Sequence, residues 1–205
     1  MISASEALDR LLEGNRRFAA GRSEQLSLSP GRRQELLAGQ KPFAIILGCS
    51  DSRVPAEIVF DQGLGDLFVI RVAGNVVAPS LVGSVEFAAV KFGTRLVVVL
   101  GHSHCGAVQA TLQELALGPE GRSPNLASIV DRIRPSVETL YETDLRHDPQ
   151  ALLHHAVRAN VRASASQLRH ASPLLEELVQ DDGLLIVGAE YDLGSGLIDF
   201  FERGG

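Results

Sequence analysis

The chain from residue 43 to residue 53 reads Phe-Ala-Ile-Ile-Leu-Gly-Cys-Ser-Asp-Ser-Arg. Its first five residues form an unbroken apolar run, which is the pattern of a strand buried on both faces. A similar run, Leu-Val-Val-Val-Leu at 96–100, precedes Gly-His-Ser-His-Cys-Gly at 101–106. The chain has two cysteines, and one stands in each polar segment. We therefore expect two buried strands that carry reactive side chains just beyond their carboxyl ends.

Apolar runs and helical patterns alternate along most of the chain. Further strands are predicted at 67–72 and 184–189, with a final extended stretch at 197–201. Helical patterns occur at 55–60, 80–92, 105–117, 126–143, 150–170 and 173–179, and a polar loop is predicted at 118–125. β-Branched strands separated by helices favour a parallel sheet that is covered on both faces. We predict an α/β fold with a central, mostly parallel β-sheet flanked by helices.

The first 40 residues differ from the remainder. A Ser-x-x-Glu capping box at residues 3–6, followed by leucines at helical spacing, predicts a helix over 4–20. A second short helix is expected over 30–37. The sequence has no repeat or linker that would mark a domain boundary. We therefore predict a single domain for the whole chain, 1–205, in which residues 1–40 are an N-terminal helical arm on an α/β core of residues 43–205.

Composition excludes several classes of function. With 205 residues the chain can bury one sizeable core. Its net charge of −6 argues against a nucleic-acid-binding protein, which needs a basic face. No apolar run approaches the roughly 18 residues of a membrane span, and the N-terminus has no secretory pattern. We therefore expect a cytoplasmic protein, in which two cysteines serve metal binding or catalysis more often than a disulfide.

Thiols and an imidazole after two neighbouring strands predict a metal site. Cys49, His102 and Cys105 provide a Cys2His ligand set, and soft sulfur ligands favour zinc over magnesium or calcium. Three protein ligands leave one tetrahedral position for water, which is the arrangement of catalytic zinc sites. A structural site would need a fourth ligand, and His104 is the candidate, although His102 and His104 are too close in one tight loop to bind the same ion readily.

Asp51 and Arg53 are predicted to form a pair beside this site. Residues two apart in an extended loop point the same way, so that the guanidinium can hold the carboxylate. A carboxylate fixed in this way can accept a hydrogen bond from the nucleophile on the metal. As a possible fourth ligand in a closed state, Asp51 would instead occupy the water position. Activity would then depend on pH.

The two segments, Cys49-Ser-Asp-Ser-Arg53 and Gly101-His-x-x-Cys-Gly106, resemble the metal motif of the β-class carbonic anhydrases. The resemblance covers nearly the whole chain. It extends to four further stretches, 11–18 (Leu-Leu-Glu-Gly-Asn-Arg-Arg-Phe), 68–71 (Phe-Val-Ile-Arg), 73–75 (Ala-Gly-Asn) and 191–196 (Tyr-Asp-Leu-Gly-Ser-Gly).

The resemblance implies one Zn²⁺ per subunit on Cys49, His102 and Cys105, with catalytic roles for Asp51 and Arg53. The implied reaction is the reversible hydration of carbon dioxide to bicarbonate and a proton by zinc-bound hydroxide, and the implied assembly is a homodimer or homotetramer. The substrate pocket is expected to include Gln62, Val72, Gly74 and Gly106. Two alternatives stay open at this point: hydrolysis of carbon disulfide or carbonyl sulfide on the same zinc site, and a non-catalytic zinc-binding module.

Overall fold

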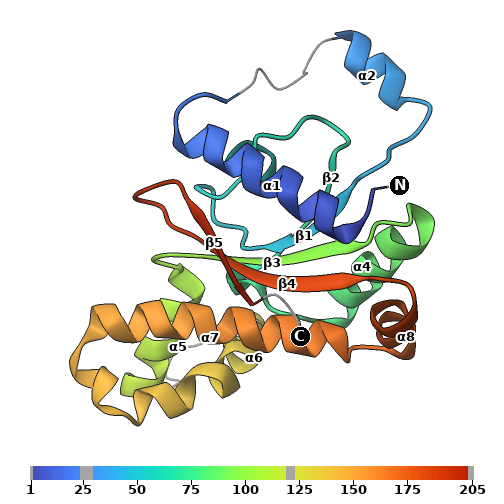
Figure 1. Ribbon diagram of the computed structural model, residues 1–205. Coiled ribbons are helices and arrows are strands. Elements are labelled where there is room, and N and C mark those ends of the chain that lie inside the picture. The colour runs from blue at the N-terminus through green and yellow to red at the C-terminus, as the bar shows by residue number, and fades with distance from the viewer. Residues whose placement is uncertain (1, 24–29, 119–122, 203–205) are drawn as a thin grey trace.

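Five strands form one sheet at the centre of the computed structural model, which describes residues 2–23, 30–118 and 123–202 (Figure 1). The strands lie side by side in the order β2-β1-β3-β4-β5. The first four in this order are parallel, and β5 pairs antiparallel with β4. The predicted α/β fold with a mostly parallel sheet is confirmed. The strands are β1 (Ala44–Gly48), β2 (Leu67–Arg71), β3 (Leu96–His102), β4 (Leu185–Tyr191) and β5 (Ile198–Glu202).

Helices connect the strands much as the sequence pattern predicts, with small shifts at their ends. The structure adds a 3-10 turn at Asp144–His147 that we did not predict. Of the predicted loop at 118–125, residues 119–122 lie outside the described residues, and Ser123 already caps a helix that begins at Pro124. The helices are α1 (Ala4–Ala19), α2 (Pro30–Leu36), α3 (Ala56–Val59), α4 (Pro79–Lys91), α5 (Gly106–Leu117), α6 (Pro124–Tyr141), α7 (Pro149–Arg169) and α8 (Pro173–Asp181), and a further 3-10 turn spans Ala73–Asn75.

Both faces of the sheet are buried, which explains the unbroken apolar runs. Successive side chains of a strand point to opposite faces. Ile46 therefore joins the core beneath α1 and α3, whereas Ile45 and Leu47 join the core formed with α4, α7 and α8. Figure 1 shows α1 on one side of the sheet and α7 and α8 on the other. A third apolar cluster, which includes both cysteines, lies among α5, α6 and α7.

The order of the strands reverses between β1 and β3. From β1 the chain passes to β2 on one side, and it then returns to form β3 on the other side of β1. The register places Ile45 opposite Val97 and Gly48 opposite Leu100, so that the carboxyl ends of both strands meet at one edge. In open α/β sheets, ligands bind at such a point. The topology therefore brings the two polar segments together.

The N-terminal segment packs on its own chain through α1. The predicted capping box is present: the Ser3 hydroxyl accepts from the backbone of Glu6, whose carboxylate accepts from the backbone of Ser3. Buried leucines of α1 contact the core of the sheet, whereas α2 has no buried residue. Within the described ranges, no helix combines the length and apolarity required to cross a membrane.

Candidate metal centre

The three predicted ligands come from the ends of two central strands. Cys49 follows β1 directly, and His102 is the last residue of β3, where it pairs with Tyr191 of β4. Cys105 is the N-terminal cap of α5. One sulfur or ring nitrogen from each of these residues lies within 4.8 Å of the others. Strand pairing therefore brings together side chains that are about fifty positions apart in the sequence.

The imidazole of His102 is oriented for a ligand. Its Nδ1 lies 2.9 Å from the Ser103 carbonyl oxygen, and a carbonyl can only accept a hydrogen bond. In the neutral ring Nδ1 therefore carries the proton, and Nε2 then has a lone pair that faces the two sulfurs. Nε2 is buried and has no hydrogen-bond partner among the described residues. A buried acceptor without a partner is costly, and a metal ion at this position would satisfy it.

The two cysteines are buried free thiols whose sulfurs lie within 4.8 Å of each other. A hydrogen bond from Cys105 lowers the pKa of the Cys49 thiol, and His102 and the Gly74 amide lower it further. The same hydrogen bond, together with burial, raises the pKa of Cys105. Burial by itself would lower the pKa of His102, but the Cys49 sulfur raises it on balance. A site that gathers negative charge on sulfur in this way fits a cation such as Zn²⁺.

Asp51 and Arg53 form the predicted ion pair at the edge of this cluster. Arg53 Nε donates to Asp51 Oδ1 at 2.9 Å, and Nη2 donates to Oδ2 at 2.7 Å. This bidentate hydrogen bonding holds the pKa of the Asp51 carboxyl well below its usual range. Asp51 Oδ2 also lies 3.8 Å from His102 Nε2. The carboxylate is thus fixed by arginine while one oxygen faces the ligand cluster.

Backbone contacts anchor the segment that carries Cys49 and Asp51. Arg71, the last residue of β2, donates to the carbonyl oxygen of Cys49 at 3.1 Å and to that of Asp51 at 2.7 Å. The backbone N–H of Gly74 donates to the Cys49 sulfur at 3.3 Å. The side chain of Arg71 at the end of β2 and the peptide N–H of Gly74 beyond it therefore hold the segment with the thiol and the carboxylate in place.

The predicted pocket residues do not all gather at the cluster. Val72 and Gly74 lie in the loop after β2, and Gly106 begins α5 directly after Cys105. Gln62 is instead buried beneath α1. Its amide donates to the Phe60 carbonyl oxygen at 2.8 Å and accepts from Arg10 at 3.0 Å. The contacts of Gln62 within one chain therefore do not connect it to the ligand cluster.

His104 has a different environment from His102. It is exposed and has a positive φ of 56°. Its carbonyl oxygen lies 3.4 Å from Nη2 of Arg53. His104 is also not part of the Cys-His-Cys group that lies within ligand distance in the described part of the chain. The arrangement therefore offers three protein ligands rather than a closed set of four.

Sequence reasoning missed Asn160, which contacts the site from α7. Its side-chain amide donates to the carbonyl oxygen of Gly74 at 2.8 Å. A signal was present in the sequence, because Asn160 lies between Val157 and Val161 on the apolar face of a predicted helix. A polar residue on such a face needs a buried partner. The identity of that partner depends on the tertiary structure.

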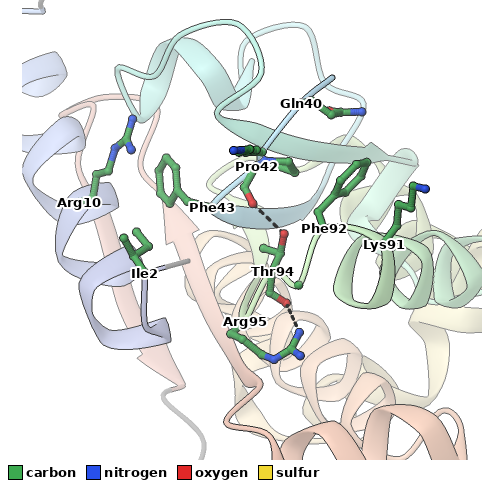
Figure 2. A pocket seen from close by; sticks show the side chains of 11 residues that line it. Ile2, Arg10, Gln40, Pro42, Phe43, Lys91, Phe92, Thr94 and Arg95 are labelled. Atoms are coloured by element: carbon green, nitrogen blue, oxygen red, sulfur yellow. Dashed lines mark hydrogen bonds between the residues drawn. The ribbon is translucent and has the colours of Figure 1, made fainter. Parts of the chain in front are cut away.

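A separate cavity lies at the opposite ends of the same strands (Figure 2). Its volume is about 540 Å³, and it is lined by residues that precede β1 and β3, including Phe43 and Phe92. Thr94 closes one side, where its hydroxyl donates to the Pro42 carbonyl oxygen at 2.7 Å. No predicted ligand or pocket residue lines this cavity. It is therefore distinct from the ligand cluster at the carboxyl ends of the strands.

Known proteins resemble this chain over most of its length. The family model described as "Carbonic anhydrase" matches residues 44–198, which include both polar segments. Carbonic anhydrase 2 of Mycobacterium tuberculosis is 42% identical over 188 residues, which cover 91% of this chain and 87% of the relative. The carbonic anhydrase of Mycolicibacterium smegmatis is 39% identical over 191 residues, covering 92% and 89% of the two chains.

Solved structures share the fold as well. A tetrameric β-carbonic anhydrase of Sordaria macrospora superposes with a TM-score of 0.76 at 25% identity, covering 98% of this chain and 99% of that chain. The β-carbonic anhydrase CafA of Aspergillus fumigatus also gives a TM-score of 0.76, at 28% identity and with coverage of 98% and 91%. The range matched by the family model contains the strand ends that carry the cluster, and the relatives and the solved structures match most of the chain. The chain therefore belongs to the β-class carbonic anhydrases, which are lyases.

Proposed function

We propose that this chain catalyses the reversible hydration of carbon dioxide to bicarbonate and a proton, with one Zn²⁺ per subunit held by Cys49, His102 and Cys105. The observation that carries the proposal is the convergence of two buried sulfurs on a buried His102 Nε2 that has no partner among the described residues. Family membership supports the reaction, because the matching relatives are named carbonic anhydrases.

The ligand set suits zinc in a catalytic role. Thiolate and imidazole are preferred zinc ligands, and a set of three leaves one position open. Zinc bound there would supply Lewis acidity that makes water nucleophilic near neutral pH. The Ser103 carbonyl keeps Nδ1 of His102 protonated, so that Nε2 is available to the metal.

Asp51 and Arg53 are proposed to position the reacting groups. Asp51 Oδ2 faces the cluster and, as an ionised carboxylate, can only accept a hydrogen bond. It can therefore fix the orientation of a donor at the open position. Arg53 holds both carboxylate oxygens and keeps the pKa of Asp51 low, so that Asp51 remains an acceptor at neutral pH. Asp51 as a fourth ligand in a closed state stays a prediction.

The proposed substrate pocket adjoins the cluster at Val72, Gly74 and Gly106, which flank Cys49 and Cys105. A Cβ at Gly106 would meet nothing within 4 Å, so there is open space beside Cys105, whereas Gly74 is confined by Ala107 and Ile133. Participation of Gln62 stays a prediction, because its amide is engaged beneath α1 within one chain. Partners are proposed to be carbon dioxide and bicarbonate, with no nucleic acid and no membrane, and the expected cytoplasmic location also stays a prediction.

We further propose that the chain, as one domain with a helical arm, assembles into a homodimer or homotetramer. The Sordaria macrospora protein is described as tetrameric. In this chain α2 has no buried residue, and Leu37 beyond it is 77% exposed. A second subunit would cover such apolar surface. Sedimentation equilibrium would distinguish the monomer from either assembly.

A non-catalytic zinc module is a weaker candidate. A structural site requires neither a carboxylate aimed at the cluster nor an arginine that holds it, yet the chain has both. Hydrolysis of carbon disulfide or carbonyl sulfide on the same site would use the same groups, and measuring turnover of these substrates alongside carbon dioxide would reveal it.

Substitution of Cys49 tests the proposal directly. We expect Cys49→Ser to lose both bound zinc and carbon dioxide hydration, measured by elemental analysis and by stopped-flow detection of proton release. Val90→Ser is the matched control, because Val90 is 62% exposed on α4 and directly precedes Lys91 and Phe92, which line the cavity at the opposite ends of the strands. It should retain both properties. An active Cys49→Ser protein that contains no zinc would overturn the proposed site.

A further inference from the structure

Gly74 connects the Cys49 sulfur to a helix that contributes no predicted ligand. Its N–H donates to Cys49 Sγ at 3.3 Å, and its carbonyl oxygen accepts from Asn160 Nδ2 at 2.8 Å. Gly74 and Asn160 are 86 residues apart in the sequence, and both are buried. An unbroken set of contacts therefore runs from α7 through Gly74 to the thiol.

Asn160 is a buried polar residue that anchors the loop containing Gly74 to α7. It is 2% exposed in the middle of α7, a helix whose other buried residues are mostly apolar. An asparagine in such a place costs stability unless its amide finds a partner. The partner is a backbone carbonyl of the loop beside the site. The hydrogen bond therefore satisfies two buried polar groups at once.

The backbone at Gly74 adopts a left-handed conformation in a confined space. Gly74 has a φ of 70° and Asn75 a φ of 45°, so two successive residues adopt the left-handed conformation. This conformation is unfavourable for a residue with a side chain. Ala107 of α5 and Ile133 of α6 pack so closely against Gly74 that a Cβ there would lie 3.0 Å and 2.7 Å from their side chains. Three helices thus confine one glycine.

The hydrogen bond from Asn160 acts by restricting the conformation of Gly74 rather than by polarising a single peptide group. The N–H and the carbonyl of Gly74 belong to successive peptide units, which are joined by the rotatable bonds at its Cα. Holding the carbonyl restricts rotation about these bonds, and this restriction keeps the N–H aimed at the sulfur. If the carbonyl were released, the N–H could turn away from Cys49.

We propose that Asn160 is a positioning residue for the metal site. Asn160 fixes the turn at Gly74 so that the Gly74 N–H donates to the Cys49 sulfur. This hydrogen bond sets the direction and the electron density of the sulfur as a metal ligand. The inference rests on the proposed function, because it requires Cys49 to bind zinc. Substituting a group that hydrogen-bonds directly to a metal ligand typically changes metal affinity or activity by about 10- to 100-fold, and Asn160 acts on such a group through Gly74. Asn160 therefore belongs to the machinery of zinc binding even though it touches neither metal nor substrate.

Two substitutions at Asn160 and one control test the proposal. Asn160→Leu keeps a similar volume without a donor, and Asn160→Asp places a carboxylate against the Gly74 carbonyl. Leu168→Ala is the control, because Leu168 is fully buried on the same helix but packs in the cluster beneath α4 and α8. The control separates a general loss of stability from a specific effect on the Gly74 turn.

The readouts are zinc affinity, by chelator competition, and the sulfur-to-cobalt charge-transfer band of the cobalt-substituted protein. We expect both Asn160 variants to bind zinc at least about tenfold more weakly. Their charge-transfer band should shift to longer wavelength, because a sulfur that loses an N–H donor gives up its electrons more readily. Leu168→Ala should lower the melting temperature while both readouts stay at wild-type values.

Folded Asn160 variants with wild-type zinc affinity and an unchanged band would overturn the inference, as would equal changes in Leu168→Ala. If neither Asn160 variant folds, the wild-type protein loaded with cadmium-113 decides by NMR. Scalar coupling of the Gly74 amide proton to cadmium, and of Asn160 Nδ2 to the Gly74 carbonyl carbon, would support the inference; absence of either would overturn it. Wild-type protein that binds no zinc would instead refute the proposed function itself.

Discussion

The Arg53 guanidinium holds both carboxylate oxygens of Asp51, at 2.9 Å and 2.7 Å, while the backbone N–H of Arg53 donates to Oδ1 at 3.0 Å. Three hydrogen bonds from one residue thus fix the carboxylate beside the cysteine–histidine cluster. This geometry depends on a planar donor with two parallel N–H groups, which arginine has and lysine lacks.

Replacing Arg53 by lysine should therefore impair catalysis while zinc stays bound. We expect Arg53→Lys to lower kcat/KM by about 10- to 100-fold, because the carboxylate loses its bidentate partner. Stopped-flow hydration assays with parallel metal analysis would measure both properties. Arg33→Lys, at an exposed position of α2, is the matched control and should behave as wild type. Full activity of Arg53→Lys would contradict the proposed role of the pair.

The pH dependence of the pair has a definite sign. The pKa of Asp51 in the folded protein lies below its ordinary value of 3.8, chiefly because Arg53 donates hydrogen bonds to the ionised form. The pair therefore stabilises the folded state fully above pH 3.8, and this stabilisation is lost as the pH falls through the lower, folded-state pKa.

The difference in unfolding free energy between wild type and Asp51→Asn should thus not narrow from pH 8 to pH 5, and protonation of His102, whose Nε2 lies 3.8 Å from Asp51 Oδ2, would only widen it. Denaturant titrations of the metal-free proteins would measure it without interference from zinc release. A difference that already narrows near pH 6 would show that Asp51 is protonated in the working range, contrary to the expected result.

Glycine at position 74 should be required for both stability and metal binding. We expect Gly74→Ala to destabilise the protein by about 1–3 kcal/mol, because it forces a Cβ into a left-handed backbone and against Ile133. The melting temperature and zinc affinity should both fall. Gly83→Ala is the control: Gly83 lies in α4, and a Cβ there meets nothing within 4 Å. That substitution should be neutral or stabilising by up to about 1 kcal/mol.

Asn15 should fix α1 to the sheet. Its amide donates to the carbonyl oxygens of Val59 and Gly196 at 3.0 Å and 2.9 Å, and its Oδ1 accepts from the N–H of Ile198 at 2.8 Å. Asn15→Leu would leave these groups without their partner, so we expect a loss of at least about 2 kcal/mol in unfolding free energy. Arg16→Leu, an exposed neighbour on the same helix, should change it by no more than about 0.5 kcal/mol. Equal losses in the two variants would contradict the anchoring role.

The sequence by itself determined the elements and the chemistry at their ends. The apolar runs before Cys49 and His102 predict buried parallel strands because such strands require apolar side chains on both faces. The capping box at Ser3 and Glu6 predicts where α1 begins, because the partners of those side chains are local. The resemblance of the two polar segments to a known motif identified the family, which the comparisons confirm.

The tertiary structure alone decided which groups touch. No local pattern states that Nε2 of His102 faces two sulfurs without a hydrogen-bond partner in the described residues, or that Gln62 is engaged beneath α1. The contact of Asn160 with Gly74 spans 86 residues. Periodicity reports only the face on which a side chain lies, whereas such contacts depend on how β1, β3 and α7 pack. The sequence therefore determined which reactive side chains lie at the ends of the strands, and packing decided which atoms contact and position them.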